Sequence, residues 1–114
     1  MDQEMKRQWV EALRSGQYAQ GQCELRNRDD DTYCVNGVLC DLHSQAHGGT
    51  GWLQLGFMRL AWFYLANHSF PDKAVQRWAG VDEDTLTELE RLNDARGREG
   101  LSFEELALYI ENTL

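Results

Sequence analysis

The spacing of apolar residues predicts a helix near the start of the chain. The members of this series recur every three or four positions, as Met5, Trp9, Ala12 and Leu13. Asp2 is placed to cap such a helix, and Gly16 is placed to end it in a left-handed conformation. We therefore expect one amphipathic helix between Asp2 and Gly16.

Residues 21–35 have the alternation of a β-hairpin. Apolar residues alternate with polar ones on both sides of three consecutive aspartates, as Cys23, Leu25, Tyr33 and Val35. The aspartates, at positions 29–31, lack the alternating spacing of calcium ligands and are typical of a turn instead. The segment is therefore predicted to be a hairpin with an acidic turn.

The Asn36-Gly37 dipeptide gives two conflicting signals. Between apolar residues it is a strong signal for a hairpin turn. The surrounding apolar residues instead follow a helical series, namely Val35, Val38, Leu39, Leu42 and Ala46. We expect a helix from Asn36 to His47, with Asn36 near its cap and the glycines at 48 and 49 as its stop.

Residues 52–65 fit two patterns. A strand pattern is carried by Leu53, Leu55 and Phe57, and a helix pattern by Phe57, Ala61, Trp62 and Leu65. One or two short strands are predicted for this segment.

A short helix and a longer one are predicted after residue 70. Pro71 suits the first position of the short helix, which Gly80 ends. Thr85, with Glu88 three residues later, has the spacing of a capping box for the longer helix. The apolar residues of the two helices are Val75, Trp78, Leu86, Leu89 and Leu92.

The last helix has clear signals at its start. Ser102 with Glu105 gives a second capping box, and Leu101 can pack on Leu106 just before the apolar face. That face comprises Phe103, Leu106, Ile110 and Leu114.

Together these elements predict a helix-rich α+β fold with a small antiparallel sheet. Residues 1–114 show no internal repeat or linker, so we expect a single globular domain. The expected core comprises Trp9, Leu13, Leu39, Leu42, Trp78, Leu89, Leu92, Leu106 and Ile110.

The chain is acidic, and its charge is unevenly placed. The 114 residues carry 11 basic and 19 acidic side chains, a net charge of -8. Residues 82–114 hold ten of the acids against three arginines, a balance of -7. Such a surface repels DNA and attracts a basic protein surface. The carboxylates expected to form it are Glu88, Glu90, Glu104 and Glu105.

No membrane or export segment is predicted. Arg59 interrupts the most apolar stretch, so no apolar run is long enough to cross a bilayer. The charged start of the chain lacks the uncharged core of a signal peptide. We therefore expect a cytoplasmic protein whose cysteines, Cys23, Cys34 and Cys40, are reduced.

The sequence contains a weak metal motif and no catalytic motif. Cys40, His43 and His47 would share one helical face, and Cys34 stands one loop away. The two cysteines are spaced more widely than in structural zinc sites, so no metal is predicted. Residues 94–105 have the length of an EF-hand loop, but arginines at its ligand positions exclude calcium. No phosphate-binding loop or nucleophile elbow is present, so we expect neither an enzyme nor a cofactor.

Four segments resemble, in the same order, those of a family of small proteins encoded by tailed phages and prophages. The segments are WVEALRSGQY, YCVNGVLCDL, FPDKAVQRWAG, and LND followed by GLSFEELALYIENTL. Asn36 departs from the family pattern, in which a cysteine or an apolar residue is common at this place. The resemblance implies a phage accessory protein, and small acidic proteins of this class are often counter-defence factors that act in the host cytoplasm.

Three functions are compatible with this class. In the first, the acidic surface binds and blocks a host defence protein. In the second, aromatic and arginine side chains enclose a nucleotide-derived immune signal, with Arg26, Trp52, Asn93 and Asp94 as candidate binding residues. In the third, the chain is a structural or regulatory phage protein without a defence target. The net charge favours the first, and a homo-oligomer is compatible with all three.

Overall fold

A computed structural model of the chain describes residues 1–56, 61–95 and 100–114. Within those ranges the fold has five helices and one two-stranded antiparallel sheet, as predicted for a helix-rich α+β protein. The elements are α1 (Gln3–Arg14), α2 (Val35–Ala46), β1 (Trp52–Leu53), β2 (Phe63–Tyr64), α3 (Lys73–Ala79), α4 (Glu83–Asp94) and α5 (Phe103–Thr113). No helix in these ranges is long and apolar enough to cross a membrane.

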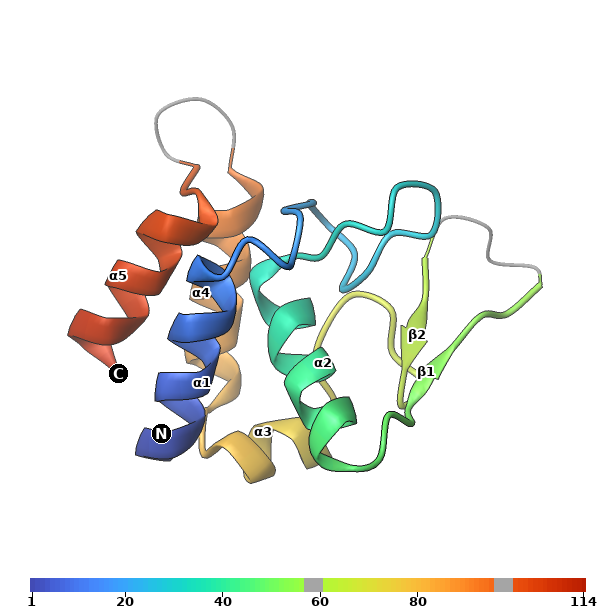
Figure 1. Cartoon of the computed structure of the whole chain (residues 1–114), viewed down its shortest axis with the longest axis horizontal. Helices are drawn as coiled ribbons and strands as arrows, with labels where there is room; N and C mark the ends of the chain where they lie inside the picture. Colours follow the sequence, from blue (N-terminus) through green and yellow to red (C-terminus); the bar gives the residue numbers. More distant parts are fainter. Residues whose placement is uncertain (57–60, 96–99) are drawn as a thin grey trace.

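The helices pack side by side, and the sheet lies beyond them. α1 packs against α5 and α2, and α4 packs against the same two helices. Figure 1 shows the sheet beside α2, at the end of the molecule opposite α5. The sheet pairs Trp52 with Tyr64 and Leu53 with Phe63, which confirms two short strands in residues 52–65. Phe57, part of both predicted patterns, lies outside the described residues.

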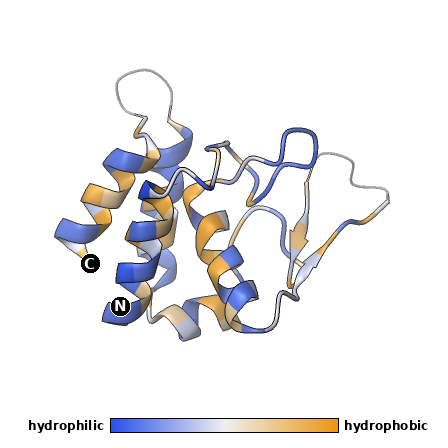
Figure 2. Ribbon diagram, in the orientation of Figure 1, coloured by the Kyte–Doolittle hydropathy of each residue, from blue (hydrophilic) through white to orange (hydrophobic). Residues whose placement is uncertain are grey.

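The inward faces of the helices form one hydrophobic core. Figure 2 shows apolar residues on the sides of the helices that face one another and polar residues on the outer sides. The predicted core residues that are buried are Trp9, Leu13, Leu39, Leu89, Leu106 and Ile110. Leu42, Trp78 and Leu92 are instead half-buried and pack against this core. Full burial of a Leu or Ile side chain contributes about 1.5–3 kcal/mol, so this core is the main stabilising feature.

Two predicted helix starts and two predicted stops are confirmed. Asp2 caps α1, since its side chain accepts a hydrogen bond from the Met5 backbone N–H at 2.9 Å. Ser102 caps α5 within a reciprocal capping box. Left-handed glycines follow α1 and end α3, with φ of 77° at Gly16 and 68° at Gly80.

The predicted starts of α3 and α4 are wrong by a few residues. α3 begins after Asp72, which accepts from the Ala74 N–H at 2.8 Å, so Pro71 precedes the cap instead of opening the helix. α4 begins after Asp82, which accepts from the Thr85 N–H at 2.8 Å. Thr85 is therefore inside the first turn. In both helices the aspartate just before the observed start accepts a free backbone N–H group.

The start of α2 also differs from the prediction. Cys34 is the cap, because its Sγ accepts from the Gly37 N–H at 3.3 Å, and Asn36 lies fully buried in the first turn. Gly37 lies against the backbone of Leu25, where an added Cβ would come within 1.8 Å of the carbonyl oxygen. The glycine therefore permits a close backbone approach and does not form a hairpin turn.

Residues 21–35 do not form the predicted hairpin strands. An antiparallel bridge joins Arg26 to Tyr33, and a backbone bond from Asn27 N–H to Thr32 O closes the acidic turn at 2.8 Å. The remaining backbone groups bond elsewhere, as when the Leu25 N–H donates to the His68 carbonyl at 2.8 Å. Because the partners come from several segments, no continuous ladder forms.

The turn between Tyr64 and Asn67 holds two residues in a left-handed conformation, and it gives a first prediction. Leu65 has φ of 48° and Ala66 has φ of 75°, and backbone bonds join Tyr64 and Asn67 in both directions. Non-glycine residues cost about 1 kcal/mol in this conformation, so Ala66→Gly is expected to stabilise the protein by about 0.5–1 kcal/mol. Urea unfolding followed by circular dichroism measures the change.

The control for this prediction is a glycine placed in a helix. Ala12→Gly, within α1, should lower the free energy of unfolding by about 1 kcal/mol. A lower unfolding midpoint for Ala66→Gly would show that this turn is not strained.

Candidate functional site

The acidic residues predicted on α4 differ in their surroundings. Glu88 accepts two hydrogen bonds from Arg91, at 2.7 and 3.0 Å, and this contact lowers the pKa of the Glu88 carboxyl. Glu90 is half-buried, and its pKa is raised by burial and by the nearby carboxylate of Asp94. Both residues are thus half-buried, and the charge of Glu88 is paired with that of Arg91 on the same helix.

The acidic residues of α5 form the outer surface of that helix. Arg14 of α1 pairs with Glu104 at 3.2 Å and with Glu111 at 3.1 Å, while Glu105 belongs to the capping box. The Glu104 side chain is still 71% exposed. Exposed ion pairs of this kind contribute only about 0–1 kcal/mol, so a partner can compete for these carboxylates.

Leu108 stands among these carboxylates and was missed by the sequence reasoning. It is 51% exposed, and in the described residues only Leu53 is another exposed large hydrophobic side chain. Residues three or four positions apart are neighbours on a helix surface. Leu108 therefore lies next to Glu104 and Glu105, which precede it by four and three residues, and next to Glu111, which follows it by three. We call these four residues the α5 face. The sequence does contain one indication of Leu108: it is an apolar residue that lies outside the helical series of buried residues in α5.

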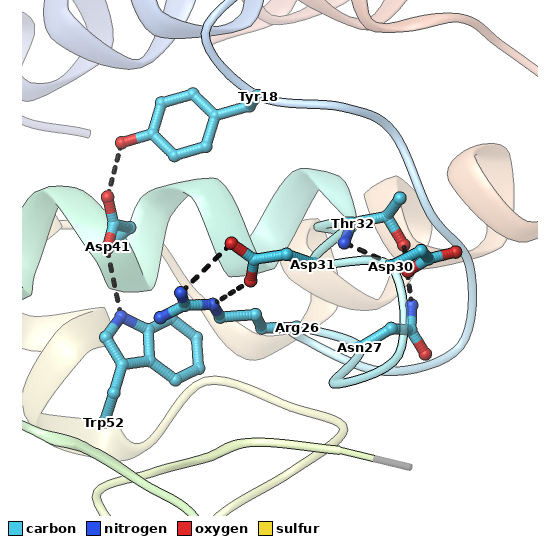
Figure 3. A network of polar contacts seen from close by, with 8 residues as sticks. All are labelled: Tyr18, Arg26, Asn27, Asp30, Asp31, Thr32, Asp41 and Trp52. Atoms are coloured by element: carbon cyan, nitrogen blue, oxygen red, sulfur yellow. Dashed lines mark hydrogen bonds and ion pairs between the residues drawn. The ribbon is translucent and has the colours of Figure 1, made fainter.

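Arg26 and Trp52 lie together, as the nucleotide hypothesis requires. The Arg26 guanidinium carbon lies 5.4 Å from the centre of the Trp52 ring. Figure 3 shows Asp31 turned toward this guanidinium, with which it forms two hydrogen bonds, of 2.5 and 3.2 Å. The Nε and Nη2 groups of Arg26 are therefore already bound to a carboxylate.

Asp41, which sequence reasoning also missed, organises the neighbouring aromatic residues. Its carboxylate accepts hydrogen bonds from Tyr18 Oη at 2.5 Å, Trp52 Nε1 at 3.0 Å and Gln45 Nε2 at 2.8 Å. Figure 3 shows Tyr18 and Trp52 on opposite sides of this carboxylate. Burial, followed by the hydrogen bond to Asp41, raises the pKa of Tyr18. A single aspartate on a predicted helix carries no sequence signal for such a role.

Asn93 and Asp94 connect α4 to the loop after α1. The Asn93 side chain is 2% exposed; its Oδ1 accepts from Val35 N and Gln20 Nε2, both at 3.1 Å. Its Nδ2 donates to Gly21 O and to Asp94 Oδ1, both at 2.9 Å. All four positions of this amide are used within the fold, so Asn93 serves as a structural connection.

A polar depression of about 760 Å³ lies beside Asn93. Gln20, Asn27, Asp30 and Thr32 are among its described lining residues, and neither Arg26 nor Trp52 lines it. The structure therefore does not bring the four residues of the nucleotide hypothesis around one pocket.

The cysteines and histidines considered as zinc ligands are engaged in packing. Cys34 and Cys40 are buried in or next to α2, and burial raises the pKa of the Cys34 thiol to about 12. The Nδ1 atom of His43 shares a hydrogen bond of 2.6 Å with Tyr64 Oη, and the His43 ring stacks on His47 with centroids 4.0 Å apart. Across the described ranges, no group of three or more His, Cys, Asp or Glu residues is arranged to hold a metal.

Comparison with known proteins gives one match. A family model described as "Domain of unknown function (DUF8296)" matches residues 1–114. No curated protein matches the chain, and no solved structure does.

Proposed function

The chain belongs to the DUF8296 family, and we propose that it is a non-enzymatic phage accessory protein that binds and blocks a host defence protein. The resemblance to small tailed-phage proteins supports the biological class. The α5 face supports the mode of action, because it combines an exposed leucine with three carboxylates.

The exposure of Leu108 is the observation that carries this proposal. Protein interfaces commonly have an apolar centre and a polar rim. Leu108 supplies such a centre, and burying its exposed half would contribute about 1 kcal/mol. Glu104, Glu105 and Glu111 supply the rim. This arrangement fits a partner surface in which lysines or arginines surround an apolar side chain.

The charge of the chain supports the choice of a basic partner. The net charge of -8 speeds the approach of a basic surface and opposes the approach of nucleic acid. A defence protein that binds nucleic acid presents a surface of this kind. Occupation of that surface by the α5 face would block it without any chemical step.

The contact between Arg26 and Trp52 favours a second candidate, the sequestration of a nucleotide-derived signal. In such a pair the guanidinium can bind a phosphate, and the indole ring can stack on a base. The two hydrogen bonds that Arg26 donates to Asp31 occupy the Nε–Nη2 edge of the guanidinium, which a phosphate would otherwise use. Blocking of a protein is therefore our preferred function.

Replacement of Leu108 tests the proposal. The purified wild-type chain is expected to capture a basic host protein, identified by mass spectrometry and then confirmed with the purified partner. Leu108→Lys should weaken this binding by about tenfold or more, since it removes apolar burial and places a cation against basic residues. Calorimetry or biolayer interferometry measures the affinity, and the association rate of the wild type should fall as salt is added.

The matched control is the other exposed leucine. Leu53→Lys, on β1, changes the charge in the same way at the opposite end of the molecule and should leave binding intact. Equal effects of the two variants would contradict a specific role for the α5 face. Capture of a phage protein alone would favour the structural or regulatory function.

A further inference from the structure

The guanidinium group of Arg26 is enclosed by three aromatic rings. Its central carbon lies 4.2 Å from the ring centre of Trp62, 5.1 Å from that of Tyr33 and 5.4 Å from that of Trp52. All three distances are within the ~6 Å limit for cation–π attraction. We call these three rings the aromatic cage.

Two walls of the cage, Trp52 and Tyr33, are held by contacts that do not involve Arg26. Trp52 donates to Asp41 at 3.0 Å, and its ring centre lies 4.7 Å from that of Tyr64. Tyr33 is 8% exposed and packs edge-on against Tyr18, with ring centres 5.0 Å apart. These two walls should therefore keep their positions when the cation inside them changes.

A carboxylate stands at the edge of the cage. Asp31 pairs with Arg26, and the Asp31 side chain is 56% exposed, whereas the Arg26 side chain is 17% exposed. The cation is thus enclosed and its counter-ion faces solvent. Aromatic rings together with one carboxylate form the chemical environment that recognises organic cations.

We propose that the aromatic cage is a binding site for a guanidinium or alkylammonium group, and that Arg26 is its internal occupant. A ligand enters when the Arg26 side chain rotates out, which leaves the backbone bond from Trp62 N–H to Arg26 O, 2.9 Å long, in place. Arg26 lies between regular elements, so no helix or strand is broken. The site does not depend on the α5 face, which lies at the other end of the molecule.

Competition by Arg26 sets the affinity for a ligand. When a site is open for only a fraction of the time, the apparent dissociation constant rises by the inverse of that fraction. Removing the guanidinium should therefore tighten the binding of small cations. We expect about a tenfold change, which corresponds to a cage that is open about one-tenth of the time.

The test uses two probes, tetramethylammonium chloride and methylguanidinium chloride, at constant ionic strength. They are titrated into the wild type, Arg26→Gln and the control Arg28→Gln, and the indole N–H signals of Trp52 and Trp62 are followed by NMR. Arg28 lies two residues away and donates to the Leu55 carbonyl and to Gln54, so its loss leaves the cage occupied. The probe that binds more tightly identifies the cation class.

Three results support the proposal together. First, Arg26→Gln binds a probe about tenfold more tightly than Arg28→Gln does. Second, adding Trp62→Leu to Arg26→Gln abolishes this gain. Third, the Arg26 Nε–H signal of the wild type moves at high probe concentration. Equal affinities of the two single variants overturn the proposal. If Arg26→Gln does not fold, the wild-type titration decides alone, and an unmoved Arg26 signal overturns it.

Discussion

Gly37→Ala is expected to destabilise the protein by about 3 kcal/mol or more, although alanine is the better helix former. Helix propensity alone would favour alanine by about 1 kcal/mol within α2. The added Cβ would lie 1.8 Å from the Leu25 carbonyl oxygen and 2.7 Å from its carbon. These are backbone atoms, so the clash requires that α2 or the segment around Leu25 move, and overpacking of this kind outweighs the propensity gain. Chemical unfolding followed by tryptophan fluorescence measures the difference.

Gly56→Ala is the matched control, because no atom of the described residues lies within 4 Å of a Cβ built at that glycine. It should change the free energy of unfolding by less than about 0.5 kcal/mol. A Gly37→Ala protein as stable as the wild type would show that Leu25 does not pack against α2 as described.

Asn93→Asp is expected to cost about 3–5 kcal/mol at neutral pH, the range for a buried charge without a partner. The change replaces the Nδ2 donor by an oxygen that faces two acceptors, Gly21 O and Asp94 Oδ1. Burial and the adjacent carboxylate would raise the pKa of the new carboxyl above its value in the unfolded chain. The folded state then holds its proton to higher pH, so the deficit relative to the wild type should shrink as the pH falls. Urea unfolding at a series of pH values measures this trend.

Asn112→Asp provides the comparison for this pH series. Asn112 is exposed on α5, so the same chemical change should alter stability by less than about 0.5 kcal/mol at each pH. A pH-independent deficit for Asn93→Asp would contradict a buried, negatively charged group as the cause.

The candidate surface was predictable in its charge and not in its geometry. The acidic composition of residues 82–114 indicated where negative charge would gather. Only the structure showed that Glu90 is half-buried, that Arg14 of α1 reaches Glu104, and that Leu108 faces solvent. Each of these facts depends on how one helix is rotated against another, which the composition of a single segment does not determine.

For Arg26 and Asn93, too, the sequence indicated the residues and only the structure showed their contacts. The sequence marked both as polar candidates for one binding site. Folding brought Trp52 and Trp62 to Arg26 and Tyr33, which lie in another segment, and used Asn93 to connect α4, α2 and the loop near Gln20. Contacts between residues so far apart in the chain are fixed by tertiary packing and leave no local periodicity to read.

The sequence by itself determined the features that arise within one or two helical turns. The caps at Asp2 and Ser102, the glycine stop at Gly80 and the apolar faces of the helices depend on neighbours a few residues away. The tertiary structure alone decided the course of residues 21–35, because their backbone groups bond to partners as distant as His68. It also decided which side chains remain exposed, since burial is a property of the assembled helices and not of any one of them.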